Sequence, residues 1–244
     1  MNRHEKEHTT VGRSVLVTGG NRGIGLAVAR RFAANGDSVA VTHRGSGAPE
    51  GLLGVKCDVT DAEQVAEAFA QAETAHGPVE VLVANAGITD DGLLMRMSDE
   101  QFSQVLETNL GGAFRVARQA SADMVRRRGG RMVFLSSVAG LRGSAGQANY
   151  ASSKAGMVGL ARSLAREFGP RSITVNVVAP GLVDTEMTEG LGQRRREQIL
   201  SEVPLGRSAS AEEVAEAVFW LASPQAAYVT GAVLPVDGGL GMGH

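Results

Sequence analysis

A tyrosine and a lysine stand four residues apart in the segment NYASSK, as Tyr150 and Lys154. On a helix this spacing places the two side chains next to each other on one face. A nearby ammonium stabilises a phenolate and so lowers the pKa of a phenol, which is about 10 in free tyrosine. A tyrosine activated in this way can donate a proton to a developing alkoxide. Because many helices contain such a pair by chance, its function must be argued from the rest of the chain.

A hydroxyl group that could assist this acid follows the β-branched run RMVFLS at 131–136. Ser137 comes 13 residues before Tyr150, at the carboxyl end of the strand that this run predicts. A hydroxyl in that place could hold a substrate carbonyl.

A glycine-rich loop, TGGNRGIG at 18–25, lies between a short apolar run and an amphipathic segment. Glycines let the backbone approach a pyrophosphate, and the amino end of a helix offers free N–H groups to that anion. The spacing is G-x-x-x-G-x-G. With a strand before it and a helix after it, the loop predicts a dinucleotide site in preference to a purely structural turn.

The end of the second predicted strand carries Thr42-His43-Arg44 and no acid. An NAD enzyme would place Asp or Glu there to bind the ribose diol, whereas a ribose phosphate calls for positive charge. Arg44, together with Arg22 of the glycine loop, therefore predicts NADPH. The alternative is that Arg44 is a solvated surface arginine.

Two further strand ends favour the same cofactor. Asp58, in Cys57-Asp58-Val59, could accept the adenine amino hydrogen or cap the following helix, and Cys57 is expected in the core. Asn85-Ala86-Gly87 ends the fourth strand, where small residues leave room for sugar and phosphates.

Short β-branched runs alternate with amphipathic segments along the whole chain, which predicts a Rossmann-like, doubly wound α/β fold with a parallel seven-stranded sheet and helices on both faces. Capping-box spacing at Thr60/Glu63 and at Ser210/Glu213 marks two helix starts. The expected strands are 14–18, 38–42, 53–57, 79–84, 131–136, 172–178 and 231–236, and the expected helices are 23–35, 61–76, 99–128, 149–168 and 211–222.

The predicted organisation is a flexible tail at 1–12 and a single domain at 13–244. After a strand that ends near Val178, Pro180 and Gly181 break the backbone, and the segment at about 184–207 is long enough to be a substrate lid. A helical hairpin that packs for stability alone is the alternative.

Composition excludes several classes of function. The chain has 244 residues and a formal net charge of −2, so it has no general attraction to nucleic acid. Its single cysteine excludes an internal disulfide framework and fits a reducing cytoplasm. The polar start resembles no secretory signal, and no apolar run approaches the roughly 20 residues of a membrane span. No metal site is expected, because the segment with His4 and His8 has no apolar face to fix them.

These motifs together resemble the short-chain dehydrogenase/reductase family over almost the whole chain from about Ser14. The resemblance rests on TGGNRGIG, CDVTD, NAG at 85–87, Asn109, Ser137, Tyr150-x-x-x-Lys154 and Pro180-Gly181. Within the family, LLMRM at 93–97, QANYASSKAG at 147–156, ITVNVVAPG at 173–181 and PVDGG at 235–239 are similar to the 3-oxoacyl-[acyl-carrier-protein] reductases of fatty acid synthesis. The glycine-loop region and the ending GMGH are similar to the actinobacterial, including mycobacterial, branch.

The resemblance implies reduction of a 3-oxoacyl thioester to a 3-hydroxyacyl thioester. It assigns proton donation to Tyr150, orientation of the ketone to Ser137, and the nicotinamide ribose to Lys154. Asn109 would anchor a water that relays protons to Lys154, although it could simply bend its helix. The cofactor-binding residues expected from the motifs and the resemblance are Gly19, Asn21, Arg22, Gly23, Ile24, Gly25, Arg44, Asp58, Val59, Asn85, Ala86, Gly87, Tyr150, Lys154, Pro180, Gly181, Val183 and Thr185.

The resemblance also implies partners. An acyl carrier protein would deliver the substrate, with Arg128 and Arg171 as its docking residues, although the arginines at 126–128 could equally be a solvated helix end. The family implies a homotetramer. Mycobacterial members carry an aromatic residue at Arg142 and an apolar one at Ser144, so the chain length of the acyl group stays open. A reductase of acyl-CoA or other small carbonyls is the nearest alternative, and a non-catalytic cofactor sensor is a remote one.

Overall fold

The computed structural model of the protein describes residues 12–45 and 47–242. The expected tail at 1–12, with His4 and His8, therefore lies outside the described residues except for Gly12. Among the described helices, none is long and apolar enough to cross a membrane.

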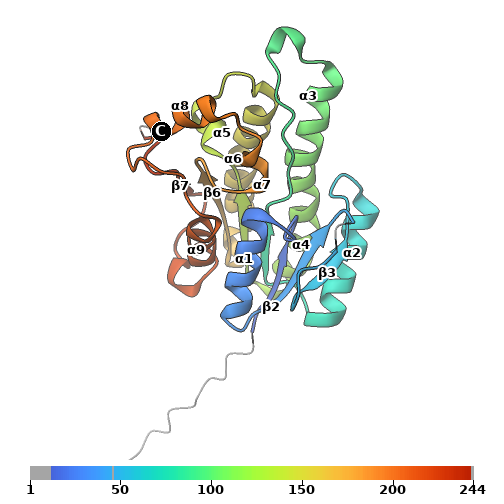
Figure 1. Ribbon diagram of the computed structural model, residues 1–244. Coiled ribbons are helices and arrows are strands. Elements are labelled where there is room, and N and C mark those ends of the chain that lie inside the picture. Colours follow the sequence, from blue (N-terminus) through green and yellow to red (C-terminus); the bar gives the residue numbers. More distant parts are fainter. Residues whose placement is uncertain (1–11, 46, 243–244) are drawn as a thin grey trace, which may run out of the picture.

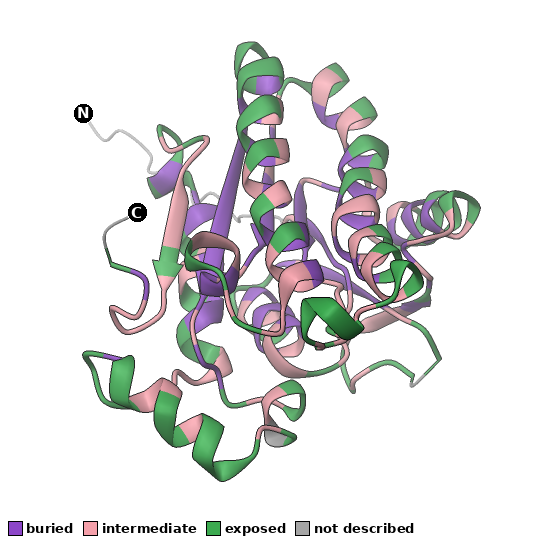
Figure 2. Cartoon of the chain, turned by 90° about the horizontal axis from the view of Figure 1, so that it is seen from above, coloured by how far each residue is buried: buried purple, intermediate pink, exposed green. Residues whose placement is uncertain are grey.

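Seven parallel strands form one sheet in the order β3-β2-β1-β4-β5-β6-β7 (Figure 1). Their apolar runs are buried on both faces, most completely in the central strands, as expected of a parallel sheet between two layers of helices. Figure 2 shows this burial from above. The predicted fold class is confirmed. The strands are β1 Ser14–Val17, β2 Ser38–His43, β3 Leu53–Lys56, β4 Val81–Ala84, β5 Gly130–Leu135, β6 Ile173–Pro180 and β7 Val233–Val236.

Two apolar clusters hold the helices to the sheet. On one face, α1 (Gly23–Ala34) and α9 (Ala211–Leu221) pack against each other and the strands. The other face is covered by α2 (Ala62–His76), α4 (Gly112–Arg127) and α6 (Ala148–Phe168). Strand β1 has β2 on one side and β4 on the other, so the chain switches direction between β1 and β4. Ligands bind at such switch points, beyond the carboxyl ends of the strands.

The helix predicted at 99–128 is interrupted. The structure has α3 (Asp99–Leu106), a π-helical turn at Glu107–Gly111, and then α4. The buried Asn109 lies in that turn. A π-helical turn is rare and often occurs at functional sites.

One of the two predicted helix starts was wrong. Asp61, not Thr60, caps α2, because its carboxylate accepts from the Glu63 and Gln64 N–H groups. Thr60 instead donates to the Asp58 carboxylate. The capping box of Ser210 and Glu213 is confirmed.

Strand β6 is longer than expected and runs through Pro180, which lies opposite Val236 in β7. Proline is tolerated at this strand end, and the ladder is continued by the Gly181 N–H, which donates to the Val236 carbonyl. The backbone therefore leaves the sheet after Pro180 and not after Val178.

The segment at 184–207 contains two short helices, α7 (Glu186–Glu189) and α8 (Gln193–Glu202). They lie beyond the carboxyl end of β6, at the same end of the sheet as α5 (Val138–Arg142) (Figure 1). No described residue of α8 is buried, so this helix adds little to the core.

Candidate active site

The structure brings Tyr150, Lys154 and Ser137 together at the carboxyl end of β5. Tyr150 and Lys154 project from the first two turns of α6, and the Lys154 Nζ lies 5.5 Å from the centre of the Tyr150 ring. Ser137 follows β5 and caps α5, and its side chain forms a hydrogen bond with that of Tyr150. An acid, a hydroxyl and a cation thus share one corner of the fold.

Lys154 is almost fully buried, with 4% of its surface exposed. Its Nζ donates to the Leu135 carbonyl over 2.7 Å. Burial lowers the pKa of the Lys154 ammonium to about 8.

Burial raises the pKa of Tyr150 to about 12, and the charge of Asp91 adds to the rise, although the hydrogen bond with Ser137 opposes it. The sequence predicted the opposite direction, with Lys154 lowering this pKa. Loss of hydration dominates the pKa of Tyr150, and the Lys154 ammonium is directed at the Leu135 carbonyl. Tyr150 is therefore fully protonated at neutral pH, as a proton donor must be.

Asn109 joins three segments of the site. Its Oδ1 accepts from the Ile88 N–H over 2.8 Å, and its Nδ2 donates to the Ile88 carbonyl and to Ser153 Oγ, each over 3.0 Å. The loop after β4 is thereby fixed to α6. Gly87 lies so close that a Cβ there would be 3.1 Å from Asn109 Oδ1 and 3.5 Å from Lys154 Nζ.

A cavity of about 440 Å³ opens beside this corner, along the carboxyl ends of β1, β2 and β4. It collects residues that the sequence placed in a dinucleotide site: Gly19, Asn21, Arg22, Gly23, Ile24, Gly25, Arg44, Asp58, Val59, Asn85, Ala86, Gly87 and Thr185. Five other expected cofactor residues do not line this cavity: Pro180, Gly181 and Val183 lead from β6 to Thr185, and Tyr150 and Lys154 lie on α6. The predicted set left out other residues that line it: Thr42, His43, Gly45, Cys57, Ile88, Thr108, Glu186 and Met187.

The glycine loop is shaped for a close approach. Gly19 and Gly23 have φ values of +62° and +51°, which favour glycine. A Cβ on Gly25 would lie 2.4 Å from the Gly19 carbonyl oxygen. The Arg22 side chain makes no capping hydrogen bond to α1, and the amino end of a helix favours an anion. These features fit the pyrophosphate of a dinucleotide.

Asp58 and Arg44 meet at the far end of the cavity. Hydrogen bonds from Thr60 and, to a smaller extent, the charge of Arg44 lower the pKa of Asp58, whereas burial opposes them. Asp58 does not cap α2, so that alternative was wrong. Cys57 is buried as expected, and burial raises its pKa to about 11.

Comparison with known proteins also supports the interpretation of this cavity as a dinucleotide site. A family model described as enoyl-(acyl carrier protein) reductase, from the short-chain dehydrogenase/reductase family, matches residues 19–241. The chain is a short-chain dehydrogenase/reductase. The family implies a nicotinamide cofactor, and the cavity has the residues to hold one.

Relatives of this dehydrogenase/reductase cover nearly its whole length. It is 58% identical to the 3-oxoacyl-[acyl-carrier-protein] reductase MabA of Mycobacterium tuberculosis, over 96% of this chain and 95% of that protein. It is 56% identical to MabA of Mycobacterium avium, over 96% of this chain and 92% of that protein. Identity to the 3-oxoacyl-[acyl-carrier-protein] reductase FabG of Escherichia coli is 45%, over 95% of this chain and 98% of that protein.

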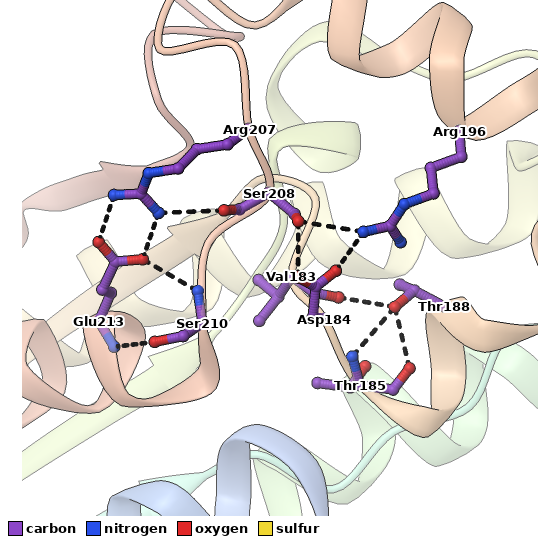
Figure 3. Close-up of polar contacts among 9 residues, drawn as sticks. All are labelled: Val183, Asp184, Thr185, Thr188, Arg196, Arg207, Ser208, Ser210 and Glu213. Carbon is purple, nitrogen blue, oxygen red and sulfur yellow. Dashed lines mark hydrogen bonds and ion pairs between the residues drawn. The ribbon is translucent and has the colours of Figure 1, made fainter.

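Surface contacts tie the expected lid of this dehydrogenase/reductase to the domain (Figure 3). The Asp184 carboxylate accepts from Arg196 of α8 over 2.5 Å and from the Ser208 hydroxyl over 2.7 Å. These hydrogen bonds, that of Arg196 most of all, lower the pKa of Asp184. These contacts join the start of the segment at 184–207 and the residue that follows it, Ser208, to α8. Asp184 directly precedes Thr185, which lines the cavity.

Arg128 and Arg171 also lie together, since the Arg128 guanidinium donates to the carbonyl of Pro170. They stand at the amino ends of β5 and β6, opposite the end that carries Ser137 and Tyr150. Arg128 ends α4 in a left-handed conformation, with φ of 57°.

The buried ammonium of Lys154 predicts how stability depends on pH. Its pKa is about 8 in the folded chain and 10.5 ordinarily. Between these values the unfolded chain binds more protons, so stability must rise with pH. Relative to Lys154→Met, the wild type should gain up to roughly 3 kcal/mol from pH 8 to above pH 10.5. Urea unfolding of both proteins across this range measures the gain, and a constant difference between them would contradict the buried cation.

Proposed function

We propose that the protein reduces 3-oxoacyl thioesters on acyl carrier protein to 3-hydroxyacyl thioesters, with NADPH as the hydride donor, in fatty acid synthesis. The observation that carries the proposal is the Ser137, Tyr150 and Lys154 corner beside the dinucleotide cavity. Relatives that share 45–58% identity over most of the chain are named for the same activity. The single cysteine fits a cytoplasmic setting.

Each residue of the corner has a defined task. The Ser137 hydroxyl holds the C3 carbonyl, and protonated Tyr150 gives its proton to the carbonyl oxygen. The Lys154 ammonium holds the nicotinamide ribose and stabilises negative charge on the phenol oxygen. Bound NADPH supplies the hydride for C3, so that one hydride and one proton convert the ketone into an alcohol.

In this proposal Asn109 holds a water molecule that relays protons to Lys154. Because the Asn109 side chain is already hydrogen-bonded to Ile88 and Ser153, the water would bind its backbone carbonyl, in the π-helical turn. Asn109 thus lies in the π-helical interruption of its helix and, in this proposal, also serves the site.

Loss of the phenol hydroxyl tests the chemistry. In Tyr150→Phe the proton donor is gone, so kcat should fall by about 10²- to 10⁴-fold. Cofactor affinity should stay within about twofold, because the glycine loop and Arg44 are unchanged. NADPH oxidation with acetoacetyl-CoA measures kcat, and fluorescence titration measures the NADPH dissociation constant. Persistent turnover would refute the role of Tyr150.

Arg44 supports the choice of NADPH over NADH. It lines the cavity with Arg22, and the end of β2, at Thr42-His43-Arg44, carries no acid for a ribose diol. Arg44→Ala should weaken NADPH binding by about 10- to 100-fold and leave NADH binding almost unchanged, because only NADPH carries the phosphate. Arg30→Ala, on the exposed surface of α1, is the matched control. Equal losses for both nucleotides, or equal use of both by the wild type, would overturn the preference.

We also propose that an acyl carrier protein docks at Arg128 and Arg171, and that the protein is a homotetramer. A left-handed arginine is a costly conformation and lies beside a second exposed cation. Both are available to an acidic protein surface.

Charge reversal at the two arginines tests whether the enzyme recognises the carrier itself or only the thioester that it bears. Arg128→Glu with Arg171→Glu should raise KM for a carrier-linked 3-oxoacyl substrate by about tenfold or more, because attraction becomes repulsion. KM for acetoacetyl-CoA should not change, since it needs no docking surface. Arg30→Glu is the control for a single charge reversal elsewhere on the surface. A parallel loss with both substrates would contradict docking here.

A further inference from the structure

The loop after β4 and the start of α6 are joined by contacts that the reaction scheme does not use. Asn149, directly before Tyr150, is fully buried. Its Nδ2 donates to the Asp90 carbonyl over 2.8 Å, and its Oδ1 accepts from the Tyr150 N–H over 2.8 Å. One side chain thus connects the loop to the backbone of the proposed acid.

Asp91 makes the second connection. Its carboxylate accepts from Gln147 Nε2 over 2.9 Å and from the Thr89 hydroxyl. Gln147 is the residue immediately before α6. The Gly92 N–H then donates to the Gly146 carbonyl over 2.8 Å, and Gly92 forms a parallel bridge with Gln147. Three successive residues of the loop, 90–92, therefore hold the turn from which α6 begins.

We propose that Asn149 and Asp91 are positioning residues: they clasp the loop at 89–92 to the first turn of α6, and so fix the Tyr150 phenol against Ser137. The inference rests on the proposed function and extends it. A proton donor must stand within hydrogen-bond reach of the carbonyl oxygen. A displacement of about 1 Å can cost on the order of 100-fold in rate.

The clasp also places a charge near the acid. The charged groups that face Tyr150 in the described structure are Lys154, from its own helix, and Asp91, from the loop, and Ser137 after β5 is its neutral partner. The negative charge of Asp91 raises the pKa of the phenol, after the larger effect of burial. Asp91 therefore acts in two separable ways, through its hydrogen bonds and through its charge.

Three variants separate these effects. Asp91→Asn removes the charge but can keep both contacts, because its Oδ1 can accept from Gln147 while its Nδ2 donates to the Thr89 hydroxyl oxygen. Asp91→Ala removes both contacts, and Asn149→Ala removes the bonds to the Asp90 carbonyl and the Tyr150 N–H but keeps the charge. Asp91→Ala and Asn149→Ala should lower kcat by about tenfold or more, with KM for NADPH unchanged. Asp91→Asn should keep kcat near neutral pH, and the alkaline loss of reduction should move to lower pH.

Ionisation of the phenol can be measured without turnover. Tyr150 and the fully exposed Tyr228 are the two tyrosines of the chain, so ¹³C labelling of the ring carbon that bears the hydroxyl gives two signals, with Tyr228 as the reference. In Asp91→Asn the Tyr150 signal should titrate at lower pH than in the wild type. Asp99→Asn removes one charge at the start of α3, outside the clasp, and should leave the signal unchanged.

Wild-type kcat in Asn149→Ala that still binds NADPH would overturn the clasp. An identical Tyr150 titration in Asp91→Asn and the wild type would overturn the effect of the Asp91 charge on the phenol. If Asn149→Ala does not fold, the comparison of Asp91→Asn with Asp91→Ala decides, because equal kcat in that pair also overturns the clasp. The titration needs no substrate. A wild type that reduced neither acetoacetyl-CoA nor the carrier-linked substrate would count against the proposed function. The titration would still show whether the Asp91 charge raises the pKa of Tyr150.

Discussion

Removal from water governs the two groups on which the proposed chemistry depends. An apolar surrounding disfavours whichever form carries charge, so burial raises the pKa of Tyr150 and lowers that of Lys154. Tyr150 remains a neutral acid through the physiological range. Lys154 remains a cation at neutral pH, because its pKa of about 8 still exceeds 7. The corner therefore combines a proton to give with a positive charge to stabilise the oxygen that gives it.

Such burial is possible only because the polar groups around it are paired, since an unpaired buried polar group costs about 1–3 kcal/mol. Asn109 pairs both backbone groups of Ile88. Ser136 Oγ donates to the Lys154 carbonyl, and Thr18 Oγ1 accepts from the N–H groups of Asn85 and Ala86. The proposed catalytic corner is thus part of the buried core, whereas the segment at 184–207 is held by exposed contacts, which open at lower cost.

The sequence could predict what depends on neighbours along the chain: the parallel sheet, the glycine loop and the shared face of Tyr150 and Lys154. It could not predict what depends on distant segments. The π-helical turn includes Asn109, whose side chain bonds Ser153, 44 residues later. The direction of the Tyr150 pKa shift follows from burial, which residue spacing does not reveal. Helix α2 also begins one residue later than the sequence predicted, so that Asp61 and not Thr60 is its N-cap.

The position of Arg128 links the two proposals that concern partners. Ser137 and Arg128 lie at opposite ends of β5, whose six residues span about 20 Å at roughly 3.3 Å each. A carrier docked at Arg128 and Arg171 therefore contacts the end of the sheet remote from Tyr150 in the same chain. If the carrier docks there, the proposed tetramer would let it deliver its thioester to a neighbouring subunit. The proposed docking of the carrier at Arg128 and Arg171 therefore depends on the proposed tetramer. A monomeric variant that still preferred the carrier-linked substrate would show that the two are independent.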